Sequence, residues 1–127
     1  MYSFSMNGYP WKAIFVKPND PMLVDRTGAL TVATTDPNTL TIYISKSISG
    51  SFLTRVLIHE LGHCAIYSFG LLEDIHKMCY PEYWVEAEEW VCNFIADYGM
   101  AIYRSAYDIL GTEAFNVIPI EIERFIA

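Results

Sequence analysis

The sequence predicts an α+β fold, a small mainly antiparallel sheet followed by helices, because its two halves differ in hydrophobic period. In the first half, β-rich segments alternate apolar and polar residues between turn formers. From Phe52 onward, apolar residues recur every three or four positions, as in helices that bury one face. The length of 127 residues and the lack of any stretch resembling a linker predict one domain over residues 1–127.

Three strands are expected in the first half. Residues 11–16 form a short apolar run that ends at the turn formers of residues 18–21. Residues 29–34 and 39–44 are β-rich and alternate in polarity, and Asp36-Pro37-Asn38 separates them. This spacing predicts an antiparallel hairpin.

Two helices are expected in the second half. The first is predicted over residues 52–69, with Ser51 as the candidate N-cap and Gly70 as the stop. Pro81-Glu82 is typical of a helix start, because proline is tolerated at the first helical position and acid favours the positive end of the helix dipole. The second helix is predicted to run from there to about Arg104.

The last residues give weaker patterns. Residues 106–112 are compatible with further helical structure. Residues 118–123 alternate like an edge strand but contain Pro119, so they are left unassigned.

Composition and charge exclude several classes of partner. Hydrophobic residues make up 53% and aromatic residues 15% of the chain, which is enough for a core without disulfides. The net charge of −7 and the lack of a basic cluster argue against nucleic acid and against lipid headgroups. We find no secretory signal pattern and no apolar run of the ~18 residues that a membrane span needs. A cytoplasmic protein is the simplest expectation.

Cysteine usage agrees with a reducing compartment. The three cysteines form no C-x-x-C pair, and an odd number suits free thiols. Each of Cys64, Cys79 and Cys92 is expected to be a small buried hydrophobic residue.

The segment His59-Glu60-Leu61-Gly62-His63 carries the clearest chemical signal. Two histidines four residues apart on a helix project from one face, as two imidazoles that share a metal must. Bound zinc lowers the pKa of a water molecule, and a neighbouring carboxylate can take its proton. The motif predicts one zinc per chain, with His59 and His63 as ligands and Glu60 as the general base.

A catalytic zinc needs at least one more protein ligand. The extended pattern with glycine and histidine after the second motif histidine is absent, because Ile66 and Phe69 occupy those positions. His76 is therefore expected on a loop or at the surface. The remaining source is the acidic start of the second helix, which contains Glu82, Glu86, Glu88 and Glu89.

A helical wheel leaves two of these glutamates open. Glu88 points into the main apolar face, which is formed by Val91, Phe94, Ile95 and Tyr98. Glu89 shares a stripe with Cys92 and Ala96, small residues that would allow close approach to the first helix. Asn93 lies one turn beyond Glu89 and could accept a hydrogen bond from a zinc-bound histidine. Packing favours Glu89 as the third ligand, Glu88 remains the alternative, and Glu88→Ala is then expected to leave zinc affinity nearly unchanged.

The chain resembles the ImmA/IrrE-type metallopeptidases of bacteria and their mobile elements over about residues 39–97. The resemblance lies in residues 42–45, the segment 59–63, and residues 89–96. It implies His59, His63 and Glu89 as zinc ligands, Glu60 as general base and Asn93 as a supporting residue. The chain departs from the family pattern at Ile95-Ala96, in place of Phe-Ala, and at Tyr98-Gly99, in place of a leucine pair.

The function expected from these residues is hydrolysis of a peptide bond in a protein substrate by a zinc-dependent metallopeptidase of zincin-like fold. One alternative is a non-catalytic, zinc-stabilised protein-interaction module. Such a site normally closes with four Cys or His ligands, which this motif does not supply. Another alternative is a zinc hydrolase of a non-peptide amide or ester, which would use the same water-activating groups.

Overall fold

The computed structural model describes residues 1–117 and confirms the α+β class. The chain divides into two compact units, Met1–Asp97 and Tyr98–Ala127. The expectation of one domain over residues 1–127 stays a prediction. The strand-like pattern at residues 118–123 lies outside the described residues.

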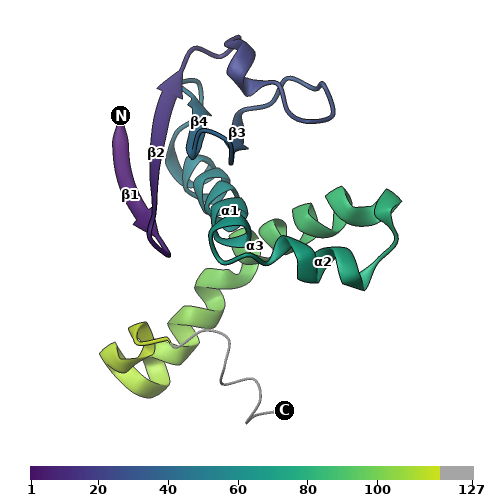
Figure 1. Cartoon of the computed structure of the whole chain (residues 1–127). Coiled ribbons are helices and arrows are strands. Elements are labelled where there is room, and N and C mark those ends of the chain that lie inside the picture. Colours follow the sequence, from purple (N-terminus) through teal and green to yellow (C-terminus); the bar gives the residue numbers. More distant parts are fainter. Residues whose placement is uncertain (118–127) are drawn as a thin grey trace. The chain divides into compact units, whose positions relative to one another are not determined.

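The sheet of the first unit has four strands in the order β1-β2-β4-β3 (Figure 1). They are β1 (Tyr2–Met6), β2 (Tyr9–Val16), β3 (Ala33–Asp36) and β4 (Thr41–Ser45). The β1/β2 and β3/β4 pairs are antiparallel, whereas β2 and β4 are parallel. The expected mainly antiparallel sheet is therefore a mixed one with a parallel pair at its centre, and β3 is an edge strand.

All three predicted strands are present with somewhat different bounds. The strand predicted at residues 11–16 is confirmed but starts at Tyr9. The predicted hairpin is confirmed as β3 and β4, but β3 begins at Ala33 and β4 begins at Thr41. The segment before it is held by Leu23 instead, because the amide and the hydroxyl of Thr31 both donate to the Leu23 carbonyl.

Strand β1 was not predicted. It pairs with β2 through a tight turn at Asn7 and Gly8, whose φ angles are 48° and 82°. Positive φ at both central residues is what a two-residue hairpin turn requires, and Asn-Gly is its preferred sequence.

The first predicted helix is confirmed as α1 (Gly50–Ser68), with Ser49 rather than Ser51 at the N-cap. It ends before Gly70, whose φ of +67° requires a residue without a side chain. A short helix, α2 (Leu72–Met78), follows and was not predicted.

The second predicted helix is confirmed as α3 (Trp84–Leu110), which is longer than expected and follows a 3₁₀ turn at Pro81–Tyr83. The second unit contains the end of α3 from Tyr98 and a 3₁₀ helix at Gly111–Phe115. Within residues 1–117, no helix has the length and apolarity to cross a bilayer.

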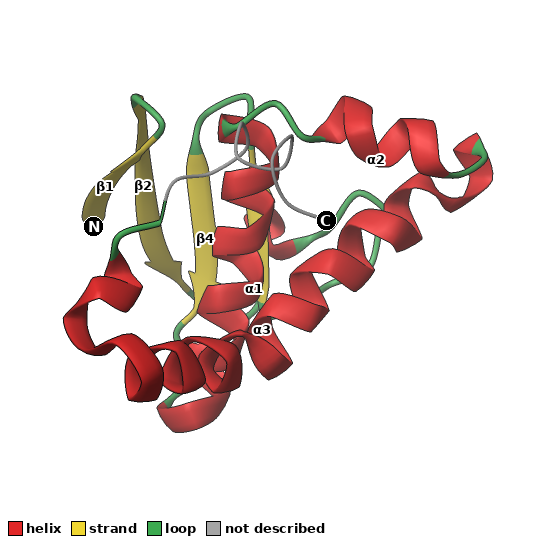
Figure 2. Ribbon diagram, turned by 90° about the horizontal axis from the view of Figure 1, so that it is seen from below, coloured by secondary structure: helices red, strands yellow, loops and turns green. Residues whose placement is uncertain are grey.

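Helix α1 lies across one face of the sheet (Figure 2). The core between them is formed by Trp11, Ala13, Ile42, Ile44 and Cys64, with Leu53, Leu57 and Leu61 of α1 packed against it. Trp11 Nε1 donates to Ser68 Oγ at 2.8 Å and so ties β2 to the end of the helix. This packing fixes the orientation of α1, which carries the histidine motif.

The contact of α1 with α3 depends on small residues. A Cβ at Gly62 would lie 3.0 Å from Cys92 Sγ, so a larger residue there would require Cys92 to shift. Cys92 is fully buried, and Ile66, Ile75, Leu71, Ala87 and Val91 surround it in a second apolar cluster. The predicted close approach at Cys92 is confirmed. The predicted apolar face of α3 is wrong in part, because Phe94 and Tyr98 are exposed.

Cysteine burial follows the prediction at two positions. Cys64 and Cys92 are fully buried free thiols. Cys79 is only partly buried, and its Sγ donates to the Ile75 carbonyl, which keeps it at the end of α2 rather than in the core.

Candidate metal centre

His59 and His63 lie on the face of α1 that borders a groove, as their four-residue spacing predicts. Their Nε2 atoms are 3.1 Å apart. Both side chains are largely buried, with 14% and 11% of their surface exposed. Two imidazoles therefore converge on one point through the same ring nitrogen.

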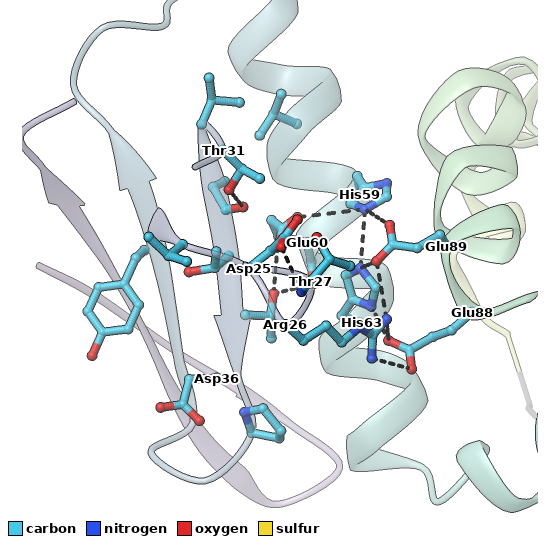
Figure 3. A pocket seen from close by; sticks show the side chains of 18 of the residues that line it. Asp25, Arg26, Thr27, Thr31, Asp36, His59, Glu60, His63, Glu88 and Glu89 are labelled. Atoms are coloured by element: carbon cyan, nitrogen blue, oxygen red, sulfur yellow. Dashed lines mark hydrogen bonds and ion pairs between the residues drawn. The ribbon is translucent and has the colours of Figure 1, made fainter. Parts of the chain in front are cut away.

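Glu89 completes this group from α3. Its Oε2 lies 3.0 Å from His59 Nε2 and its Oε1 lies 3.2 Å from His63 Nε2. Figure 3 shows Glu88 and Glu89 reaching toward the histidines from α3. The carboxylate of Glu89 thus faces both Nε2 atoms, which is the position that a third ligand would need.

Glu60 is placed differently from Glu89. Its Oε2 is 3.7 Å from His59 Nε2, and its Oε1 accepts a hydrogen bond from Thr35 Oγ1 at 3.0 Å. Burial raises the pKa of the Glu60 carboxyl, and the charges of His63 and His59 oppose that shift. His59, Glu60 and His63 lie close enough together to share a metal ion, and Glu89 lies nearer than Glu60 to His59 Nε2.

Glu88 contacts the other nitrogen of His63. His63 Nδ1 donates to Glu88 Oε2 at 2.5 Å, since a carboxylate can only accept. Arg26 holds the same carboxylate through two hydrogen bonds of 3.1 and 3.2 Å and also donates to Glu89 Oε1. Glu88 is 8% exposed, as its predicted inward orientation implies. Its contact is with the ring nitrogen that faces away from His59 and Glu89.

Asn93 has a different partner from the one predicted. Its Oδ1 accepts from Arg55, which also forms an ion pair with Asp97. The Nδ1 atom of His59 is buried without a hydrogen-bond partner, and that of His63 is bonded to Glu88. Neither ring therefore receives the expected support from Asn93, whose amide oxygen accepts from Arg55 instead.

His76 is not part of the centre. It lies in α2 rather than on a loop, and its ring stacks on Trp84 with centroids 3.9 Å apart. This agrees with the expectation that His76 is not a ligand. Glu82 and Glu86 are exposed, so the acidic start of α3 contributes only Glu88 and Glu89 to the cluster.

The centre opens into a groove of about 860 Å³. One wall is α1, and another is formed by residues 21–22, 24–27 and 31–37, which include the edge strand β3. Glu88 and Glu89 line it from α3. The groove therefore connects the convergent nitrogens with solvent and with a strand edge.

The charges at the centre favour a cation. Among the described residues, Glu88 and Glu89 both pair with the guanidinium of Arg26, whereas Glu60 accepts from the neutral hydroxyl of Thr35, so three carboxylates gather here with one paired guanidinium. Burial alone would lower the pKa of His63, but hydrogen bonds with Cys92, Glu88 and Glu89 outweigh it and raise that pKa to about 12. Hydrogen bonds from His59 and His63 hold the pKa of Glu89 far below its usual range. A positive charge between these carboxylates is stabilised.

The donor set and its spacing fit zinc. At usual Zn–N and Zn–O bond lengths, two ligand atoms of a tetrahedral site lie about 3.3 Å apart. His59 Nε2 and His63 Nε2 lie 3.1 Å apart, and each lies at a similar distance from one oxygen of Glu89, 3.0 Å to Oε2 for His59 and 3.2 Å to Oε1 for His63. Two imidazoles and one carboxylate are a known catalytic ligand set for zinc.

Arg26 was missed by the sequence argument. Turn formers around it, Asp25, Thr27 and Gly28, indicate a tight turn, but nothing in the sequence pairs that turn with a helix 62 residues away.

Comparison of the chain with protein-family models, with curated proteins and with solved structures finds no match.

Proposed function

We propose that this chain is a zinc-dependent metallopeptidase that hydrolyses a peptide bond in a protein substrate. The observation that carries the proposal is the convergence of His59 Nε2, His63 Nε2 and the Glu89 carboxylate beside Glu60. Glu60 is buried beside them and lies farther than Glu89 from His59 Nε2. Three ligands and a spare carboxylate are the composition of a catalytic zinc site rather than a structural one.

Zinc bound there would act as a Lewis acid on the substrate carbonyl and make a water molecule more acidic. Glu60 accepts the proton of the attacking water and returns it to the leaving amine. Thr35 holds one oxygen of Glu60, so the other is oriented toward the histidine side of the groove. Removal of Glu60 from bulk water raises its pKa, which favours its later role as a proton donor.

The walls of the groove support a peptide substrate. Residues 33–36 line the groove and form the edge strand β3. An edge strand offers backbone amides and carbonyls to an extended chain, which is a common way to bind peptides. A small ester would use little of a groove of about 860 Å³.

We also propose a zincin-like fold, kinship with the ImmA/IrrE-type metallopeptidases and a cytoplasmic location. Support for the kinship comes from the order of elements, with Ile42-Tyr43-Ile44 in β4, the histidine motif in α1 and Glu89 in α3. No nucleic acid is proposed as a partner.

The zinc-loaded protein is expected to cut peptides in a proteome-derived library, with new termini identified by mass spectrometry. Metal-free protein should cut none of them, and added zinc should restore the same cleavage sites, because the attacking water depends on the metal. If protein carrying one zinc per chain cuts no peptide, the peptidase proposal fails. Turnover of small amide or ester reporters alone would instead identify a non-peptide hydrolase.

A further inference from the structure

The side chains behind His63 form a chain of contacts that the proposed reaction does not use. His63 Nδ1 donates to Glu88 Oε2, and both Glu88 oxygens accept from the guanidinium of Arg26. Glu88 and His63 each expose only 11% of their side-chain surface. A buried carboxylate is costly unless its oxygens are bonded, and here both are.

We propose that Glu88 and Arg26 are positioning residues for the metal centre, an inference that rests on the proposed zinc site. Glu88 fixes the proton of His63 on Nδ1, and Arg26 fixes the carboxylate of Glu88. A neutral imidazole carries one N–H, so donation from Nδ1 leaves the Nε2 lone pair facing His59 and Glu89. A carboxylate behind a metal-binding histidine also makes that ligand more basic.

Arg26 suits this role because of its planar fork. Its Nη1 and Nη2 bind separate oxygens of Glu88, a geometry that lysine cannot reproduce. Nη2 also donates to Glu89 Oε1 at 3.2 Å. One side chain thereby orients both the partner of one histidine and the carboxylate that faces both histidines.

The loop that carries Arg26 is itself well defined. Asp25 Oδ1 accepts hydrogen bonds from the amides of Thr27 and Ala29 and from the Thr27 hydroxyl. These bonds close the turn in which Arg26 lies. Because Asp25, Arg26 and Thr27 also line the groove, the Arg26 contacts connect a groove wall with the metal centre (Figure 3).

The two histidines differ in whether the Nδ1 atom has a hydrogen-bond partner. His59 Nδ1 is buried without a hydrogen-bond partner, whereas His63 Nδ1 has Glu88. The orientation of His63 is therefore fixed by polar contacts that His59 lacks. Without Glu88, neither histidine ring would have a hydrogen bond at its Nδ1 atom.

The test is zinc affinity, measured by competition with a calibrated chelator on full-length variants that circular dichroism shows to be folded with zinc. Glu88→Ala is expected to weaken zinc binding about 10–100-fold, the usual effect of losing such an outer partner. Glu88→Gln can still accept a hydrogen bond from His63 Nδ1, so it should lose less zinc affinity than Glu88→Ala. Arg26→Met and Arg26→Lys should both weaken zinc binding, and the effect of Arg26→Met should be smaller once Glu88 is alanine, because only the contact of Arg26 with Glu89 is then left to lose.

Two exposed positions give matched controls. Glu86→Ala removes a carboxylate from the start of α3, and Lys17→Met removes a cation from a loop. Both should bind zinc as the wild type does. A general effect of charge would change the zinc affinity of the control variants and of the test variants alike.

A second readout is the ¹⁵N-edited NMR signal of His63 in the zinc-loaded protein. It should show a protected Nδ1 proton in the wild type, a shifted one in Arg26→Met and none in Glu88→Ala. The inference is overturned if Glu88→Ala keeps wild-type zinc affinity and the protected proton, or if it loses zinc while Glu89→Ala keeps it. The proposed peptidase could fail separately, because peptide cleavage is not part of either readout.

Discussion

Glu60→Gln is expected to lower kcat/KM for peptide cleavage about 10²–10⁴-fold, the usual effect of removing a general base. Glutamine keeps the size of the side chain and can still accept from Thr35 Oγ1. It cannot take a proton from water. Zinc content should remain at the wild-type level, because Glu60 Oε2 lies 3.7 Å from His59 Nε2 and Glu89 is nearer.

Steady-state kinetics on a peptide found in the library screen, together with elemental analysis, checks this result. Glu86→Gln, an exposed carboxamide substitution at the start of α3, is the control and should keep full activity. Cleavage by Glu60→Gln at the wild-type rate would show that another group activates the water. Loss of zinc in this variant would place Glu60 among the ligands.

Glu89→Ala is expected to cause the largest loss of zinc affinity among the glutamate variants, well beyond the about 10–100-fold effect of losing an outer partner. Without Glu89, two protein ligands remain where a catalytic zinc normally has three. Glu89→Gln should bind zinc little better than Glu89→Ala, because a neutral amide is a poor substitute for a charged oxygen ligand.

Chelator competition under the conditions used for Glu88→Ala measures this effect. The expected order of loss is Glu89→Ala, then Glu88→Ala, then Glu86→Ala, which should have none. The sequence alone predicted no loss for Glu88→Ala, and the bond between Glu88 and His63 changes that expectation. The reverse order for the first two would make Glu88 the ligand and place the family resemblance out of register by one residue.

Most elements of the fold could be predicted from hydrophobic period and turn residues. The β3–β4 hairpin and helix α1 follow such patterns directly. Strand β1 also had a signal, alternation of apolar and serine residues before Asn7-Gly8, which a search for two-residue turns would have found. The parallel pairing of β2 with β4 had no local signal, because it joins segments separated by a long connection.

Helix α3 shows why the site could be predicted only in part. Period alone placed Phe94 and Tyr98 on the buried face, yet the helix buries Cys92 against Gly62. Packing against α1 decides which stripe faces inward, and a helical wheel does not include the partner. Spacing did identify His59 and His63, because a four-residue interval fixes their geometry within one helix. No fixed sequence spacing of this kind connects Arg26 with the histidines or with Glu88.

The central claim is that His59, His63 and Glu89 hold one zinc ion. A crystal structure of the zinc-loaded protein, with diffraction collected on both sides of the zinc absorption edge, tests it most directly. We expect one anomalous peak per chain, bonded at about 2.0–2.2 Å to His59 Nε2, His63 Nε2 and a Glu89 oxygen, with Glu60 unbonded. A peak absent from this position, or one coordinated by Glu88 or Glu60 in place of Glu89, would contradict the account.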